Sequence, residues 1–320
     1  MFKVPMLFPG QASQSVGMAG DLAARGGPGA AFLATVDDAL GFALTRVMRE
    51  GPEATLTETW NAQPAILAHS VAVALELREL GIAPSVVAGH SLGEFSAAVA
   101  VGALSPRDGL ALVRRRGELM FAAGQERPGT MAAIMGLDAD AVRRVCAEVA
   151  GSAGVVVLAN HNSSNQIAIS GEIAAVDAAC EALKAAGAKR ALRLNVSGAF
   201  HSPLLSGAAD SFADHLADVA IADPEAPLVA NVTAAPSTTA AQLREGFRRQ
   251  LTSPVRWHES LAALVSGAAT GERPRVVLEV GPGKVLSNLA KREFPEVTFL
   301  AVGTAEELDN VLDTVRGLLA

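Results

Sequence analysis

The sequence predicts an α/β protein with a large domain built on a parallel sheet and a smaller inserted subdomain. The chain has 320 residues, of which 50% are hydrophobic and 18% charged, a composition that can fill two cores. Short apolar runs ending in Gly or Pro alternate with segments of helical periodicity, as in parallel α/β sheets. A compact series with its own glycine boundaries interrupts this order between residues 129 and 195.

The first part of the large domain alternates strand and helix. An apolar run from Val4 to Phe8 stops at Pro9-Gly10, where a strand meets a loop. Residues 61–80 carry apolar side chains at helical spacing, and Gly81 ends that helix. Beyond it we predict a buried strand at Val86–Ala88 and helices at 91–101 and 107–120, the last begun by the Ser105-Pro106 capping pattern.

The inserted segment has the order β-α-β-β-α-β. This order is the split βαβ, ferredoxin-like plan, in which two helices cover one face of a small sheet. We therefore assign residues 1–128 and 196–320 to the large catalytic domain and residues 129–195 to the subdomain. The predicted elements of the insertion are an apolar strand at 130–135, a helix at 138–150, strands at 154–159 and 166–170, a helix at 172–186 and a strand at 189–194.

The larger pattern resumes after Ser197. We predict a helix at 203–219, a strand at Leu228–Val232, a helix at 239–251 and a last buried strand at Val276–Val280. The next residues, Gly281-Pro282-Gly283-Lys284, resemble a phosphate-binding loop but lack the P-loop spacing. A plain strand-to-helix turn is the favoured interpretation.

Composition and charge exclude several classes of protein. The formal net charge of −7 argues against nucleic-acid binding, which needs a clustered excess of Lys and Arg. The apolar runs are too short to cross a membrane, and two prolines and a glycine break the first ten residues, so we expect no signal peptide and a cytoplasmic location. Cys146 and Cys180 stand among apolar residues at helical spacing and are interpreted as core thiols.

The pentapeptide Gly89-His90-Ser91-Leu92-Gly93 predicts a nucleophilic serine. It follows a predicted strand and precedes a predicted helix, which is the context of a nucleophile elbow. The glycines permit the tight turn that exposes the Ser91 hydroxyl. The amide of Leu92 lies at a helix N-terminus, where it can stabilise an oxyanion.

A nucleophilic serine needs a base, and the chain has 6 histidines. His201 is the best candidate because it stands in a Gly- and Ser-rich loop between a strand and a helix. His69 and His215 lie on predicted helices and are more simply solvated or capped. Residues 160–162 could bind ligand or form a turn. No His or acidic cluster has metal-ligand spacing, so we predict no metal site.

Taken together, these motifs resemble those of the malonyl-CoA:acyl-carrier-protein transacylases and the related acyltransferase domains of polyketide synthases. The resemblance implies an α/β-hydrolase-like large domain and covers nearly the whole chain. That family's first motif usually has glycine where this chain has Ala12. The matching segments are residues 8–14, 89–96, 116–117, 160–171, 198–202, 230–233, 250–257 and 279–283.

The resemblance also implies roles for individual residues. Ser91 would accept the acyl group and His201 would be its base, with no carboxylate as a third member. A backbone carbonyl near Gln250 would orient the imidazole and so fix its tautomer. The amides of Gln11 and Leu92 would form the oxyanion hole. No cofactor is implied, since malonyl-CoA is the substrate.

Arg116 would bind the free carboxylate of a malonyl group, because a guanidinium matches a carboxylate through two hydrogen bonds. The alternative is that residues 114–116 form a solvated basic run on the polar side of a helix. The helical phase places Arg116 on the same stripe as Val113 and Leu119, facing inward, and places Arg114 and Arg115 off it.

Phe200 precedes the expected base, and in the acyltransferase domains of the resembled family a Phe here accompanies malonyl use and a Ser methylmalonyl use. Gly198 differs from the His that is common in those domains. We therefore expect Phe200 to contribute to selectivity for malonyl.

The resulting expectation is a cytoplasmic, monomeric malonyltransferase of fatty-acid or polyketide synthesis. It would load malonyl from CoA onto Ser91 and pass it to the phosphopantetheine thiol of an acyl carrier protein. The alternatives are an acyl hydrolase of the same fold and a non-catalytic protein that docks carriers. Because carrier proteins are acidic, a basic rim should receive them, with Lys189, Arg190, Lys284, Lys291 and Arg292 as candidates.

Overall fold

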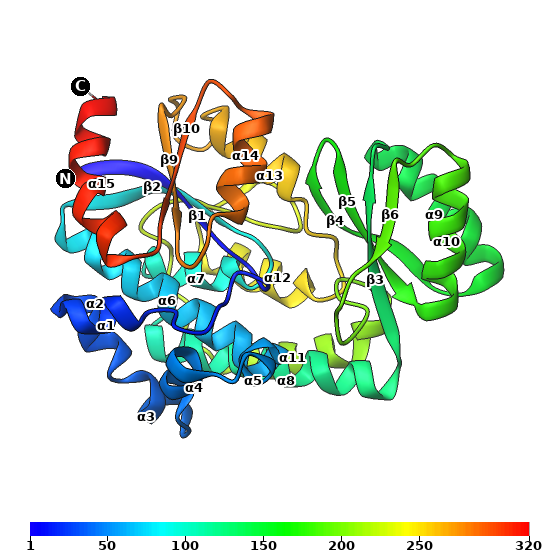
Figure 1. Cartoon of the computed structure of the whole chain (residues 1–320), viewed down its shortest axis with the longest axis horizontal. Helices are drawn as coiled ribbons and strands as arrows, with labels where there is room; N and C mark the ends of the chain where they lie inside the picture. Colours follow the sequence, from blue (N-terminus) through cyan, green and yellow to red (C-terminus); the bar gives the residue numbers. More distant parts are fainter. Residues whose placement is uncertain (320) are drawn as a thin grey trace.

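The computed structural model describes residues 1–319 and contains two sheets that lie side by side (Figure 1). The larger sheet has six strands in the order β10-β9-β1-β2-β7-β8. Both chain termini lie in this larger unit, on the side away from the smaller sheet. The strands are β1 (Phe2–Phe8), β2 (Ile82–Gly89), β7 (Leu228–Val229), β8 (Pro236–Ser237), β9 (Val276–Val280) and β10 (Thr298–Val302).

The large sheet is parallel except for β8, which pairs antiparallel with β7. Strand β1 lies between β2 and β9, and its residues from Val4 to Phe8 are buried, as expected of a central parallel strand covered on both faces. Because the strands are parallel, their carboxyl ends meet at one edge. Phe8 pairs with Gly89 there, at the start of the predicted elbow.

Helices cover both faces of the large sheet. Met6 and Leu278 pack on one face in a core shared with α6, α7 and α8, and Leu7 and Val277 pack on the other with α13 and α14. This alternation follows the period of two of a strand. The longer helices of this unit are α6 (Thr59–Glu79), α7 (Gly93–Ala100), α8 (Pro106–Glu126), α11 (Ser206–Ala217), α12 (Ala240–Gln250), α13 (Trp257–Val265), α14 (Val285–Glu293) and α15 (Ala305–Leu319).

The smaller sheet is antiparallel, in the order β4-β5-β3-β6, and packs with two helices around its own core. This confirms the predicted fold class. Cys146 and Cys180 are both free and buried in that core, as predicted. The elements are β3 (Gly129–Met135), α9 (Ala139–Ala153), β4 (Val156–Ser163), β5 (Gln166–Glu172), α10 (Ile173–Ala185) and β6 (Arg190–Arg193).

Some elements differ from the sequence-based expectation. Val276–Val280 is not the last strand, because β10 follows it at the sheet edge. Strand β7 ends at Val229 because the chain turns at Ala230 and brings Asn231 to the elbow. The predicted helix at 203–219 begins with a 3-10 turn, Pro203–Leu205. Five short helices were not predicted because they span too few residues for periodicity: α1 (Gly20–Arg25), α2 (Gly27–Leu33), α3 (Val36–Leu40), α4 (Leu44–Glu50) and α5 (Glu53–Thr57).

Within residues 1–319, none of the helices is both long enough and apolar enough to span a bilayer.

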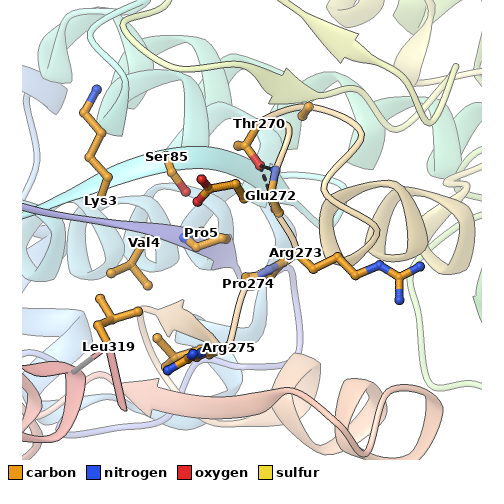
Figure 2. A pocket seen from close by; sticks show the side chains of 12 residues that line it. Lys3, Val4, Pro5, Ser85, Thr270, Glu272, Arg273, Pro274, Arg275 and Leu319 are labelled. Atoms are coloured by element: carbon orange, nitrogen blue, oxygen red, sulfur yellow. Dashed lines mark hydrogen bonds between the residues drawn. The ribbon is translucent and has the colours of Figure 1, made fainter. Parts of the chain in front are cut away.

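A cavity of about 460 Å³ lies at the amino ends of β1 and β9, where Lys3, Ser85 and Glu272 are among the lining residues (Figure 2). The guanidinium of Arg273 points away from the other labelled side chains. This cavity is at the opposite end of the strands from Ser91 and holds none of the predicted catalytic residues.

Candidate active site

Ser91 lies in the sharp turn between β2 and α7. Its φ is +51°, in the left-handed region that non-glycine residues rarely adopt. A Cβ on Gly89 would come within 2.0 Å of the Gly93 backbone, and a Cβ on Gly93 within 2.2 Å of the Phe8 carbonyl oxygen. Both glycines are therefore required by close backbone approach, and the turn lifts Ser91 to the carboxyl edge of the sheet.

Ser91 and His201 form a hydrogen-bonded pair although they are far apart in sequence. Ser91 Oγ is 2.8 Å from His201 Nε2, and His201 Nδ1 is 3.0 Å from the backbone carbonyl oxygen of Gln250. The carbonyl can only accept, so Nδ1 carries the proton and Nε2 is left as an acceptor for the serine hydroxyl. Burial, together with the nearby Arg116 charge, lowers the pKa of His201 to about 3, so the imidazole is neutral at physiological pH.

Arg116 is buried beside the pair, with 1% of its surface exposed. Its Nη2 donates to Ser91 Oγ at 3.1 Å and to Gln250 Oε1 at 2.9 Å, and its Nη1 donates to Gln63 Oε1 at 2.7 Å. Within the part of the chain that the structure describes, its Nε–H has no partner. Burial lowers the pKa of Arg116 to about 10, which leaves it charged at neutral pH.

The alternative of a solvated basic run is wrong for Arg116 and right for its neighbours. Arg114 and Arg115 are partly exposed and pair with Glu118 on the outer side of α8. The helical phase thus separated the fully buried Arg116 from two partly exposed arginines, of which Arg114 also donates to the Trp60 carbonyl and Asn61 of α6.

Two polar residues that sequence reasoning missed support the elbow. Asn231 Oδ1 accepts from the Ser91 amide at 2.8 Å, and its Nδ2 donates to the Gly89 carbonyl at 2.6 Å. Glu94 is fully buried and accepts from the side-chain amide of Gln250 and from the backbone N–H of Asn231. Desolvation raises the pKa of Glu94 to about 7. Its sequence signal is that Glu94 is the one acid in a helix of small and apolar residues, which indicates a buried charge with partners elsewhere in the fold.

The pair opens into a cavity of about 370 Å³ between the two sheets. The small unit supplies part of its wall, including Asn160 and Asn162, and His90 Nε2 lies 2.8 Å from Asn162 Oδ1. His161 is not part of the wall and instead pairs with Glu259 at 3.1 Å. The other lining residues include Gln11, Ser91, Leu92, Arg116, Met131, Gln166, Ala168, Leu194, Phe200, His201, Val285 and Leu289.

Gln11 and Leu92 both border this cavity, as Ser91 does. Gln11 comes after β1 and Leu92 precedes α7, so their amide groups belong to a loop and a helix N-terminus at the same sheet edge. The Gln11 side chain is held by Thr59, whose hydroxyl donates to its Oε1 at 2.9 Å. This placement is compatible with an oxyanion hole.

Ala12 adopts a φ of +78° next to Gln11, and its side chain is exposed. A Cβ in this left-handed conformation destabilises the folded state by about 1–2 kcal/mol. This strain exceeds the loss of stability that glycine causes by adding conformational entropy to the unfolded chain. We therefore expect Ala12→Gly to raise the melting temperature by roughly 1–3 °C.

The control is Ala178→Gly, at an exposed position inside α10, where glycine should lower stability by about 0.5–1 kcal/mol. Equal destabilisation by both substitutions in thermal unfolding would show that Ala12 is not strained.

The chain is similar to known proteins over nearly its whole length. The family model described as the acyl transferase domain matches residues 6–308. The chain belongs to the acyl transferase family. This acyl transferase is 41% identical over 316 residues to the malonyl CoA-acyl carrier protein transacylase of Bacillus subtilis, covering 99% of this chain and 98% of that protein. It is 40% identical over 314 residues to the Escherichia coli K12 protein of the same name, covering 98% and 100%.

Solved structures show the same likeness. One holds a malonyl-transacylase in complex with a type II polyketide synthase acyl-carrier protein; the acyl transferase described here is 40% identical to it, with a TM-score of 0.91 and coverage of 98% and 99%. Another is an acyl carrier protein S-malonyltransferase from Vibrio cholerae, at 39% identity, a TM-score of 0.90 and coverage of 97% and 99%.

The predicted basic rim of this acyl transferase is only partly at the cavity. Lys284 precedes α14, which carries Lys291 and Arg292 and lines the cavity with Val285 and Leu289. The backbone N–H of Lys189 donates to the carbonyl of Met135 at one end of the β3–β6 pair. The backbone N–H of Leu194, which lines the cavity, donates to the carbonyl of Met131 at the other end. Five residues of extended chain span about 17 Å. Lys189 and Arg190 are therefore at the far end of β6, not at the mouth.

His69 does not line the cavity. His69 is buried and bonds the Gly303 carbonyl at 2.6 Å, so it is a core residue rather than a solvated one. Over residues 1–319, no three His, Cys, Asp or Glu side chains are grouped so as to hold a metal ion. Gly281-Pro282-Gly283 forms the turn between β9 and α14.

Proposed function

We propose that the protein transfers a malonyl group from CoA to the phosphopantetheine thiol of an acyl carrier protein through a malonyl-Ser91 ester. The observation that carries this function is the buried Arg116, which donates to Ser91 Oγ and whose Nε–H has no partner among residues 1–319. A buried cation at a serine nucleophile suits an acyl group with a free carboxylate. The names of the relatives and the complex with a carrier protein support the same reaction.

In the first half-reaction, His201 Nε2 takes the proton of Ser91 Oγ as the oxygen attacks the thioester carbonyl. The amides of Gln11 and Leu92 stabilise the oxyanion of the tetrahedral intermediate. When the intermediate collapses, the C–S bond breaks and the proton on His201 goes to the departing CoA thiolate. The Gln250 carbonyl holds the imidazole in one tautomer throughout.

In the second half-reaction, the carrier thiol gives its proton to His201 and attacks the ester carbonyl. The C–O bond to Ser91 breaks, and His201 returns the proton to Ser91 Oγ. The neutral state of His201 is essential here, because it must accept a proton in each half-reaction; its low pKa keeps it neutral at physiological pH.

The competing function is hydrolysis of acyl groups from carrier proteins, with water as the second acceptor. A hydrolase that acts on varied acyl chains gains nothing from a buried cation, so Arg116 favours transfer. The third possibility, a non-catalytic docking protein, does not account for the 2.8 Å bond between Ser91 and His201.

Intact-protein mass spectrometry separates transfer from hydrolysis. After mixing with malonyl-CoA and removal of excess, the protein should carry one malonyl group, and adding the thiol-bearing carrier should move that mass to the carrier. Rapid release of free malonate without a lasting adduct would favour the hydrolase.

We further propose that Phe200 favours malonyl over methylmalonyl. Its ring is buried and lines the cavity beside His201, where it fills space that an added methyl would need. One methyl misfit is worth about 1–3 kcal/mol, or roughly 10- to 200-fold in kcat/KM. Phe200→Ser should reduce this preference in competition between equal concentrations of the two thioesters, and an unchanged ratio would contradict the assignment.

We propose that the protein acts in the cytoplasm as a monomer. Two buried free cysteines fit a reducing compartment, and one chain supplies every residue of the site. Lys284, Lys291 and Arg292 are the proposed contacts for an acidic carrier, because they lie on or next to the cavity-lining α14.

A further inference from the structure

Glu94 is a buried carboxyl group to which the catalytic steps described above assign no role. It lies in the first turn of α7, three residues after Ser91, and only 1% of it is exposed. Burying a carboxylate is costly unless hydrogen bonds and a countercharge compensate. Its neighbours on the helix are small or apolar, so packing alone does not require an acid here.

The partners of Glu94 lead to Arg116 through one side chain. The Gln250 amide nitrogen donates to Glu94 and also to the Ser91 carbonyl oxygen at 3.0 Å, while the Gln250 amide oxygen accepts from Arg116 at 2.9 Å. The second oxygen of Glu94 accepts from the Asn231 backbone at 3.2 Å. Glu94 is thus linked to Arg116 by a single amide group.

A side-chain amide has two chemically different ends, and its surroundings decide which way it faces. The Ser91 carbonyl and an ionised Glu94 can only accept hydrogen bonds, so they require the NH₂ end of Gln250. The oxygen end must then face Arg116, which can only donate. Loss of the Glu94 charge weakens one of the three contacts that fix this orientation, the other two being those to the Ser91 carbonyl and to Arg116.

We propose that Glu94 is a positioning residue for acyl selectivity, which orients the Gln250 amide so that its oxygen holds the Arg116 guanidinium against Ser91. This inference rests on the proposed function, in which Arg116 binds the carboxylate of the acyl group. Glu94 also supplies a negative charge near Arg116 in the free enzyme, where no carboxylate of the chain touches the guanidinium directly among the described residues.

The arrangement makes selectivity depend on pH. Desolvation raises the pKa of Glu94 to about 7, so acidification below neutrality protonates it. A protonated Glu94 is a weaker acceptor for the Gln250 amide and no longer supplies a negative charge near Arg116, so the amide and the guanidinium are both held less firmly. The other titratable groups around it are Arg116, with its pKa lowered to about 10, His201, with its pKa lowered to about 3, and His90, whose burial lowers its pKa. Between pH 6 and 9, the group expected to titrate is therefore Glu94.

The test compares malonyl-CoA with acetyl-CoA in the Ser91-loading step between about pH 6 and about pH 9. For the wild type, the malonyl-to-acetyl ratio of kcat/KM should fall as the pH drops below about 7. Glu94→Gln should lower the ratio at pH 8 by about 5- to 30-fold and remove its pH dependence, while acetyl loading stays within about threefold.

Two further variants make the result decisive. Glu76→Gln changes another buried glutamate, which caps the Gly29 amide away from the site, and should leave the ratio and its pH profile unchanged. Gln250→Met removes the linking amide and should give a low, pH-independent ratio that Glu94→Gln does not lower further. The comparison of Gln250→Met with the wild type remains informative if Glu94→Gln fails to fold.

A wild-type ratio that is flat across this pH range would overturn the inference, as would equal loss of malonyl and acetyl loading in Glu94→Gln. The outcome is distinguishable from failure of the proposed function. If Arg116→Ala lowers the ratio and Glu94→Gln does not, only the role of Glu94 is wrong. If Arg116→Ala leaves the ratio unchanged, the proposed binding of the acyl carboxylate is itself wrong.

Discussion

Ser91→Ala should abolish the malonyl-enzyme adduct and lower transfer by at least about 10⁴-fold, because the attacking oxygen is removed and its base has nothing to deprotonate. Ser91 Oγ is 2.8 Å from His201 Nε2, and its backbone amide is held separately by Asn231, so the turn itself should persist in the variant. The measurement is intact-protein mass after incubation with malonyl-CoA, together with the rate of malonyl-carrier formation.

Ser96→Ala is the matched control, because Ser96 is a fully buried serine on α7, the helix that follows Ser91. Among the described residues its hydroxyl has no hydrogen-bond partner, so its removal should not disturb the fold or the loading step. A full malonyl adduct on the Ser91→Ala protein would place the nucleophile elsewhere and refute the mechanism.

Arg116→Ala should cost about 2–4 kcal/mol of selectivity for malonyl over acetyl, or roughly 30- to 1000-fold in the ratio of kcat/KM. The charge-assisted hydrogen bonds to the malonyl carboxylate are lost, whereas acetyl has no carboxylate to bind. The substitution also leaves the amide oxygens of Gln63 and Gln250 without a donor, which should destabilise the fold. The malonyl-to-acetyl ratio of kcat/KM does not change when less protein is folded, because both substrates react with the same folded fraction.

Arg115→Ala is the control for charge and helix position. Its guanidinium is on the exposed side of α8, 3.6 Å from Glu118, so the malonyl-to-acetyl ratio should stay at the wild-type value. A ratio that Arg116→Ala leaves unchanged would remove the main support for the substrate assignment.

The sequence predicted the fold class because the longer segments have clear periodicity and clear boundaries. Residues 61–80 and the insertion between 129 and 195 correspond to α6 and to the four-stranded sheet with its helices. The short helices between Gly20 and Thr57 could not be predicted, because five to seven residues barely exceed one helical turn. The edge strand β10 was missed although residues 299–302 form an apolar run.

The candidate site was predictable only where a motif or a helical phase marked it. Ser91 follows from the elbow pattern and the inward position of Arg116 from its phase, and the structure brings both to His201. Gln63 carries no local pattern that indicates hydrogen bonding, and Glu94 stands out only as a lone acid in a small and apolar helix, a signal that names no partner. Their roles depend on which atoms meet across α6, α7 and α12, a tertiary arrangement that no single segment of sequence encodes.

The cavity between the two sheets has a consequence for how acyl preference can evolve. The proposed catalytic groups all belong to the large unit, and the glycines of the elbow leave no room for substitution. Met131, Gln166 and Ala168 line the same cavity from β3 and β5 of the small sheet, where Met131 and Ala168 also pack against the core of the large unit. Mutations there can reshape the wall while the nucleophile, base and oxyanion donors keep their places. New acyl specificities are therefore more accessible through these residues of the small sheet than through the elbow, whose glycines admit no side chain.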